Sequence, residues 1–198
     1  MSVKQGLLAL LVEGPRYGAE LKTEFERRTG GAWPLNIGQV YTTLARLQRD
    51  GLVAPAGEDA QRHPRYAVTE DGRADVAAWF AAPVRREAPA RDELAIKLAL
   101  AVTVPGVDVR ALIQTQRAAS LRALQDYTRL KRRPDGDGDL AWTLVLESLI
   151  FAAEAEVRWL DHCEARVARA AAGRAEAAGA GVAAAGATAG AAGTAGRR

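Results

Sequence analysis

Several residue types that support common protein chemistries are scarce in this chain of 198 residues, which has one cysteine, one methionine and two histidines. The single cysteine, Cys163, excludes an internal disulfide and a cysteine-rich zinc site. His162 precedes it directly, and neighbouring side chains on a helix point about 100° apart, so the pair is not expected to share a metal. We therefore predict no metal and no cofactor, and the scarcity of thiols fits a reducing, cytoplasmic location.

Catalytic and membrane signals are also missing. Neither histidine has a serine or cysteine at a recognisable catalytic spacing, and no glycine-rich loop is suited to hold a phosphate. No run of about 18 uninterrupted apolar residues is present, so no membrane span is expected. The apolar segment GLLALLV near the N-terminus ends in Glu13 without a small-residue cleavage site, and it is predicted to be a core helix. These absences argue against an enzyme and against a membrane protein.

The overall charge does not identify a nucleic-acid partner, because the net charge is only +3. From Met1 to Phe80, ten basic residues balance ten acidic ones. The distribution of charge is more informative, since from Gly31 to Arg49 the only charged residues are Arg46 and Arg49. A stretch without acids, with glutamine, tyrosine and threonine between its arginines, is typical of a surface that contacts DNA bases and phosphates.

The segment 36–53, NIGQVYTTLARLQRDGLV, combines a core stripe with a polar outer face. At about 100° per residue, Val40, Leu44 and Leu47 fall on one side of a short helix. Gly51 suits the left-handed position after a helix, and a strand is predicted to follow it. Helix, glycine and strand in this order are typical of the recognition helix and wing of a winged helix-turn-helix, although an amphipathic core helix can show the same pattern.

The flanking segments complete this arrangement. Apolar spacing predicts one helix over 7–12 and a second from Tyr17 to about Gly30. Two short strands, 53–56 and 65–69, are predicted to form a hairpin with a basic tip. The next helix begins after Thr69 as its N-cap, and its buried stripe is predicted to consist of Val76, Trp79 and Phe80.

Three helices are predicted in the C-terminal half, over 92–102, from Asp108 to about 131, and from Asp139 to about Arg169. Apolar residues of the last helix spread over more than one face, so one face is expected to contact its own domain and another a second copy. A monomeric helical domain with a wide core is the alternative. The residues predicted to form the dimer interface are Leu149, Phe151 and Trp159.

The C-terminal segment 171–198 has a different composition, with fourteen alanines and seven glycines among 28 residues. Glycine recurs too often there for a stable helix, and no residue is available to build a core. Disorder is therefore predicted for this segment.

The region from Gln5 to Phe80, with PRYGAEL, WPLNIGQVYTTLARLQRDGLV and RYAVTEDGR, resembles the winged helix-turn-helix domain of PadR-type bacterial transcriptional regulators. The block DELAIKLAL at 92–100, with two long helices after it, resembles their helical dimerisation domain. The chain departs from the pattern at Thr42, where many relatives have proline, and in its long C-terminal segment. The resemblance implies a homodimeric DNA-binding regulator, usually a repressor that a small molecule releases.

The expected fold is mainly α with a small β-hairpin wing. The expected domains are a winged helix-turn-helix over 1–82, a helical dimerisation and possible effector domain over 90–170, and the Ala/Gly segment 171–198. Double-stranded DNA with an inverted repeat is the expected partner. A protein-interaction or ligand-binding module without specific DNA binding stays open as an alternative.

The candidate DNA contacts fall into three groups by their expected partners on the duplex. Base edges are assigned to Gln39, Thr42 and Arg46. Phosphates are assigned to Tyr17, Tyr41, Thr43 and Arg49, and the wing contacts to Arg62, His63 and Arg65. The resemblance further implies a small hydrophobic or aromatic effector near the dimer interface, and the aromatic side chains proposed to line its pocket are Trp79, Tyr127, Trp142, Phe151 and Trp159.

Overall fold

The computed structural model describes residues 2–84, 91–131 and 140–193. The chain divides into two compact units, of which the first comprises Met1–Pro89 with Arg129–Ser148 and the second Ala90–Thr128 with Leu149–Arg198. The first unit therefore takes in a segment that the predicted boundaries assigned to the C-terminal domain. Asp139, the predicted N-cap of the last helix, lies outside the described residues.

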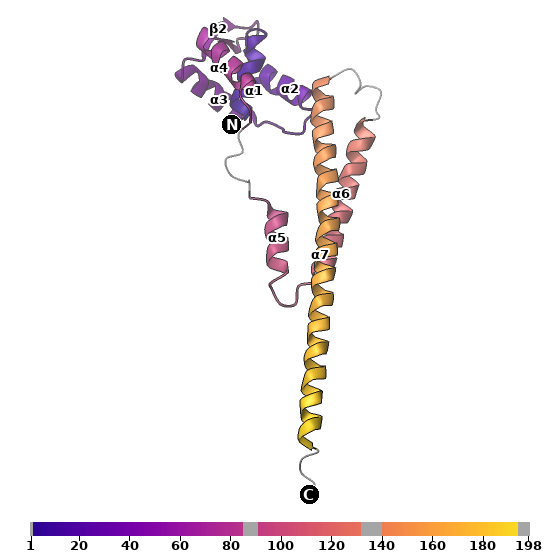
Figure 1. The fold of residues 1–198 in the computed structure, drawn as a ribbon. Coiled ribbons are helices and arrows are strands. Elements are labelled where there is room, and N and C mark those ends of the chain that lie inside the picture. The colour runs from indigo at the N-terminus through magenta and orange to yellow at the C-terminus, as the bar shows by residue number, and fades with distance from the viewer. Residues whose placement is uncertain (1, 85–90, 132–139, 194–198) are drawn as a thin grey trace. The chain divides into compact units, whose positions relative to one another are not determined.

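The N-terminal part of the first unit has the helix and strand order of a winged helix-turn-helix (Figure 1). The prediction of a short helix with one buried stripe is confirmed, because α3 spans Ile37–Arg49 with Val40, Leu44 and Leu47 buried. The elements in chain order are α1 (Ser2–Val12), β1 (Arg16–Tyr17), α2 (Gly18–Arg28), α3 (Ile37–Arg49), β2 (Val53–Glu58), β3 (Pro64–Val68) and α4 (Glu70–Ala81).

The sheet has three antiparallel strands in the order β1-β3-β2, one more than the predicted hairpin. The additional strand β1 pairs Arg16 with Tyr66 and Tyr17 with Arg65. Its two residues are too few to show a period-two pattern, so sequence alone could not reveal it. Strand β1 joins the segment between α1 and α2 to the wing strand β3, which fixes the position of the wing beside the helices.

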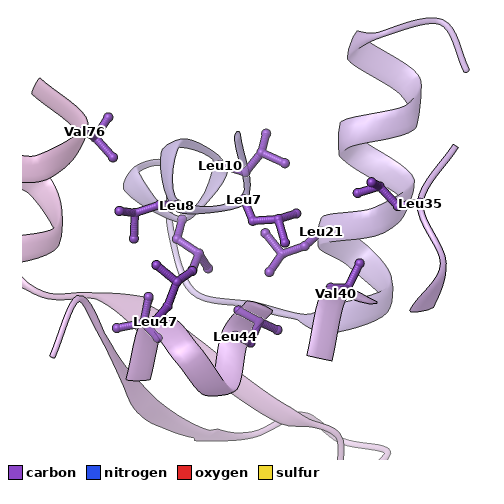
Figure 2. Close-up of a cluster of buried hydrophobic side chains, with 11 residues drawn as sticks. Leu7, Leu8, Leu10, Leu21, Leu35, Val40, Leu44, Leu47 and Val76 are labelled. Carbon is purple, nitrogen blue, oxygen red and sulfur yellow. The ribbon is translucent and has the colours of Figure 1, made fainter. Parts of the chain in front are cut away.

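One leucine-rich core holds these elements together, and it lies between α1, α2, α3 and the sheet (Figure 2). Burial of a leucine or valine side chain stabilises a fold by about 1.5 to 3 kcal/mol. The fully or nearly fully buried members are Leu7, Leu8, Leu10, Leu11, Leu21, Leu35, Val40, Leu44, Leu47, Val53 and Val76.

Helix α4 differs from its predicted packing. Thr69 caps it as expected, since the Thr69 hydroxyl accepts a hydrogen bond from the Gly72 amide at 3.1 Å. Val76 is buried, but Trp79 and Phe80 are 38% and 70% exposed and pack against each other. The prediction of a buried stripe was wrong for these two aromatics, because α4 presents little more than one buried row to the core.

The second unit contains α5 (Glu93–Ala101), most of α6 (Val109–Lys131) and most of α7 (Leu140–Gly193). Asp92 caps α5 through a hydrogen bond from the Ala95 amide to its carboxylate, at 3.1 Å. Leu98, Ile113 and Leu160 form its buried core. Polar pairs join α6 to α7 along an antiparallel register, among them Gln114 to Glu164, Arg117 to Asp161 and Gln116 to Glu156.

Helix α7 continues to Gly193, whereas the sequence predicted an end near Arg169 and disorder from residue 171. Alanine has the highest helix propensity of all residues, and each glycine costs only about 1 kcal/mol relative to it. A helix that is already formed also extends without a new nucleation step. From residue 171 to Gly193, thirteen alanines therefore outweigh six glycines in a helix that packed residues have already nucleated.

Trp159, one of the residues predicted at the dimer interface, also packs within its own unit. Its side chain is half-buried and packs against the core of Leu98, Ile113 and Leu160 in its own unit. Leu149 is also half-buried, whereas Phe151 is 67% exposed. Since α7 turns about 100° per residue, Trp159 and Phe151, eight residues apart, point about 80° from each other. Of the predicted interface residues, Phe151 is the most exposed.

Charged side chains tie α2 to the turn before it. Arg28 contacts both Glu24 and Glu13 at 2.7 Å, and Arg27 contacts Glu24 at 2.8 Å. Hydrogen bonds from Arg27 and Arg28 lower the pKa of Glu24 from 4.5 to about 2. A carboxyl group whose pKa is lowered by folding contributes stability above its unfolded pKa and loses it as the pH falls through the folded value.

We therefore expect Glu24→Gln to lower the free energy of unfolding at pH 7 by about 1 kcal/mol, after allowance for solvent screening of a surface network. The deficit should shrink between pH 4.5 and pH 2, where the wild-type carboxylate becomes protonated. Urea unfolding at several pH values measures it. Glu58→Gln, which removes only an exposed contact of 3.7 Å with Arg62, is the control. A deficit that stays constant down to pH 2 would exclude an ionic contribution.

Candidate DNA-binding surface

The turn before α3 is anchored by a residue that sequence analysis missed. The Glu26 carboxylate accepts hydrogen bonds from the Leu35 amide at 2.9 Å and from Lys22 at 2.7 Å. The Lys22 hydrogen bond, followed by that from Leu35, holds the pKa of Glu26 below its usual value. At the start of α3, the Asn36 side chain accepts from the Gly38 amide at 2.8 Å. These contacts fix where the recognition helix begins relative to α2.

Tyr41 connects α3 to the first turn of α2. A Cβ atom at Gly18 would lie 2.8 Å from the Cε1 and Cζ atoms of the Tyr41 ring, so the ring packs directly on the α2 backbone. The Tyr41 side chain stays 37% exposed at the edge of this contact. Tyr41 therefore remains a candidate phosphate contact in a position that the fold holds rigidly.

The outer face of α3 carries the three residues assigned to base edges. Gln39, Thr42 and Arg46 are all exposed. The Thr42 hydroxyl donates to the Gly38 carbonyl at 2.8 Å, and the half-buried Thr43 donates to the Gln39 carbonyl at 2.7 Å, which leaves both hydroxyl oxygens as acceptors. Arg46 makes no ion pair or hydrogen bond with any of the residues that the structure describes, so its guanidinium is available to a ligand.

Arg49 is paired with the acid that directly follows the acid-free stretch 31–49. Its guanidinium donates to the Asp50 carboxylate at 2.8 and 3.1 Å. This hydrogen bond is the main reason that the pKa of Asp50 lies below its usual value, and Lys4 approaches the same carboxylate at 3.9 Å. The outer face of α3 is thus less purely cationic at its C-terminal end than the composition of 31–49 suggested.

The tip of the wing is organised by Asp59. Its carboxylate accepts hydrogen bonds from the Gln61 amide at 2.9 Å and the His63 amide at 2.7 Å, and lies 2.8 Å from the His63 Nδ1 atom. Desolvation raises the pKa of Asp59, but the hydrogen bonds from His63 and Gln61 outweigh it and hold the pKa low. The His63 ring also stacks on Tyr17 at 5.0 Å, which links the wing tip to β1.

The two wing arginines have different surroundings. Arg62 is exposed, adopts a left-handed φ of 64° at the tip of the turn, and lies 3.7 Å from Glu58. Arg65 is half-buried, and its guanidinium donates to the Pro15 carbonyl. The assignment of Arg65 as a DNA contact therefore needs revision, because its side chain holds β3 against the turn before β1. Arg62 remains the exposed cation of the wing.

The aromatic residues assigned to an effector pocket have different surroundings within the two units. Trp79 packs on Phe80 in α4, Trp159 packs in the core of the second unit, and Phe151 is exposed. Trp142 lies against Gly30, where a Cβ atom would be 2.0 Å from its ring. Tyr127 lines a cavity between α6 and α7.

Helix α3 and the wing, with the exposed Arg62 at the wing tip, form a surface suited to a polyanion. Among the described residues, no three histidine, cysteine, aspartate or glutamate side chains are grouped as metal ligands would be. No described helix is long and apolar enough to cross a membrane. The geometry supports insertion of α3 into a DNA groove with contacts from the wing beside it.

Comparison with known families supports the same reading of both halves. The model of the transcriptional regulator PadR-like family matches residues 7–78, and the model of the virulence activator alpha C-terminal domain matches residues 90–168. Residues 7–78 thus match the PadR-like family of transcriptional regulators. Its members regulate transcription, and the fold expected from the resemblance, mainly α with a small sheet, is confirmed.

Relatives of this PadR-like regulator cover most of its length. A probable transcriptional regulator of Mycobacterium tuberculosis is 28% identical over 179 residues, which cover 81% of this chain and 95% of the relative. The crystal structure of Bacillus subtilis PadR in complex with operator DNA matches with a TM-score of 0.64 at 19% identity, covering 84% of this chain and 99% of PadR. The Vibrio cholerae virulence activator AphA matches at 0.62 with 21% identity, covering 84% and 98%.

Proposed function

We propose that this PadR-like regulator binds an inverted-repeat operator as a homodimer, represses the adjacent gene and is released by a small molecule. The observation that carries the proposal is the outer face of α3, where Arg46 is exposed beside Gln39 and Thr42. Arg46 makes no hydrogen bond or ion pair with the described residues, and its charge interacts with that of Asp50. The existence of a Bacillus subtilis PadR structure in complex with operator DNA supports it by analogy. Such a regulator acts where the DNA is, in the cytoplasm.

Each residue of the surface has a proposed role. Arg46 donates to a guanine edge in the major groove, and Gln39 and Thr42 contact neighbouring bases. Phosphate contacts are proposed for Tyr17, Tyr41, Thr43 and Arg49, with Arg49 exchanging Asp50 for a phosphate. Arg62 and His63 contact the backbone from the wing, whereas Arg65 supports the wing from behind.

A dimer explains the apolar side chains that α5 and α7 leave exposed. Phe151 and Leu144 on α7, and Ile96 and Leu100 on α5, are all exposed large hydrophobic residues. A second copy that covers them would place two recognition helices in successive major grooves, with half-site centres about 34 Å or a multiple apart. The proposed operator is therefore symmetric.

We expect Phe151→Asp to produce monomers, because a carboxylate would be forced into an apolar interface without a partner. Sedimentation equilibrium of the full chain measures the mass, and Phe151→Leu, which keeps an apolar side chain, should remain a dimer. The aspartate variant should also lose most of its affinity for the inverted repeat. A Phe151→Asp protein that sediments as a dimer would place the interface elsewhere.

The DNA-binding proposal is tested by titrating a fragment from the promoter beside the gene and a scrambled fragment at several salt concentrations. A specific regulator binds the promoter fragment more tightly at every salt concentration, with a linear dependence of log K on log salt. Equal binding to both fragments would favour the alternative, a winged-helix interaction or ligand-binding module without sequence preference.

A further inference from the structure

A cavity of about 360 Å³ opens between α6 and α7 within the second unit. Its volume is at the lower end of the range for small-molecule sites, about 300 to 1,000 Å³. The space exists because four alanines line it where longer side chains would fill the gap between the helices. The remaining lining residues are Gln116, Ser120, Tyr127, Leu149 and Glu156.

Glu156 is the only charged residue in the lining. Its Oε1 atom accepts hydrogen bonds from Gln116 Nε2 at 2.9 Å and from the Ser120 hydroxyl. These donors orient the carboxylate but engage only one of its oxygens. Among the described residues no hydrogen-bond donor reaches Oε2, and no cationic side chain pairs with the carboxylate. The cavity thus contains a positioned carboxylate with an oxygen available to a ligand.

The cavity has distinct polar and aromatic ends. Ser120, beside Glu156, and Tyr127 are seven residues apart on α6, which corresponds to about 10 Å along the helix axis. Leu149 and Glu156 have the same separation on α7. The alanines and Leu149 form apolar walls between the two ends. A ligand that fits this arrangement has a positive charge at one end and a compact apolar or aromatic body.

We propose that this cavity binds a small organic cation, a protonated amine attached to an aromatic or compact apolar group. The ammonium group donates hydrogen bonds to the free oxygen of Glu156, and the apolar body lies between the alanines with its far end near Tyr127. The inference that this cation is the effector rests on the proposed function. It differs in charge from p-coumaric acid, the compound bound in a Bacillus subtilis PadR structure. An anionic carboxylate ligand would be repelled by Glu156.

Binding at this cavity has a route to the proposed dimer. The cavity is lined by Leu149 and Glu156 on α7, and the exposed Phe151 lies on the same stretch of that helix. A ligand between α6 and α7 favours one spacing of the two helices over another. Because it can shift the dimer only through different affinities for the two spacings, ligand and DNA binding should be linked reciprocally.

Calorimetric titration of the full-length protein at pH 7 tests the site, with protonated tryptamine as the cation and 3-indolepropionate as an anion of similar size and shape. We expect one tryptamine per chain and no measurable binding of the anion. Glu156→Gln should weaken tryptamine binding at least tenfold, since an amide carries no charge. Glu154→Gln, an exposed residue on the same helix outside the cavity, is the matched control and should bind as the wild type does.

A second variant tests the space rather than the charge. Ala123→Leu places a larger side chain in the cavity while it leaves Glu156 in place, and it should abolish binding without lowering the melting temperature. The proposal is overturned if the wild type binds no tryptamine at millimolar concentration, if Glu156→Gln binds it equally well, or if the anion binds as tightly. The proposal is also overturned if a side chain of a second copy occupies the cavity. In that case Glu156→Gln would change the oligomeric state, and the wild type would bind no cation.

Operator binding is measured on the same preparation by fluorescence anisotropy. A protein that binds the operator but takes up no tryptamine refutes the cation site and leaves the proposed function standing. A protein that takes up tryptamine with the expected loss in Glu156→Gln, yet shows no preference for the operator, supports the site and refutes the proposed function.

Discussion

Replacing Arg46 by alanine is expected to weaken binding to the operator by about 1 to 3 kcal/mol and to change binding to random DNA little. Arg46 is exposed on the outer face of α3 and makes no hydrogen bond or ion pair with the described residues beyond a charge interaction with Asp50, so its removal leaves the fold intact. Anisotropy titrations on operator and random duplexes, at matched salt, measure both affinities.

Arg62→Ala is the matched control for the contribution of charge alone. Arg62 is an exposed cation at the wing tip, and its loss should weaken binding to both duplexes alike and reduce the salt slope by about one. Equal losses on both duplexes for Arg46→Ala would show that Arg46 contacts the backbone rather than a base. Arg49→Ala should have a smaller effect than Arg46→Ala, because Asp50 already competes for the Arg49 guanidinium.

Gly72→Ala is expected to destabilise the protein by about 1 to 3 kcal/mol through overpacking. A Cβ atom at position 72 would lie 2.2 Å from the Leu52 carbonyl oxygen and 2.8 Å from Val68 Cγ2. The Leu52 carbonyl accepts a hydrogen bond from the Thr69 amide at 3.0 Å, so the backbone there cannot retreat without losing that bond. Urea unfolding, followed by circular dichroism, measures the change.

Gly173→Ala serves as the control because it makes the same substitution in a helix where no atom lies within 4 Å of the new methyl group. It should stabilise α7 by about 0.5 to 1 kcal/mol, as expected from helix propensity alone. Opposite signs for the two variants would confirm that contact with Leu52 and Val68 causes the loss at position 72. A Gly72→Ala protein as stable as the wild type would mean that α4 can move away from the sheet.

The elements that the sequence predicted well are those in which apolar residues repeat at a regular spacing within the element itself. The spacing of Val40, Leu44 and Leu47 repeats with the helical period, and the structure buries all three. Thr69 caps its helix as predicted, because capping depends on residues that are neighbours in the chain. Predictions of this kind succeed because the information lies within a few residues.

The parts that could not be predicted depend on contacts between distant segments. Arg65 is a basic residue of the wing, which is why it was assigned as a DNA contact. Its hydrogen bond to the Pro15 carbonyl joins residues 50 positions apart, and no local sequence pattern predicts it. The same holds for Glu26, which receives the Leu35 amide, and for the stacking of His63 on Tyr17. In each case a polar side chain holds two segments together through a contact that local sequence patterns do not encode.

Gln39 and Arg46 contribute little to holding the fold together, which bears on how such a regulator can evolve. Their side chains make no hydrogen bond or ion pair with other described residues, whereas Val40 and Leu44 between them are buried. Substitutions at positions 39 and 46 therefore cost little stability, since surface changes of this kind usually stay within about 0.5 kcal/mol. After a gene duplication, one copy could acquire a new target site through these positions while its core stayed unchanged. Divergence of regulatory targets in such a lineage would proceed without a loss of foldability.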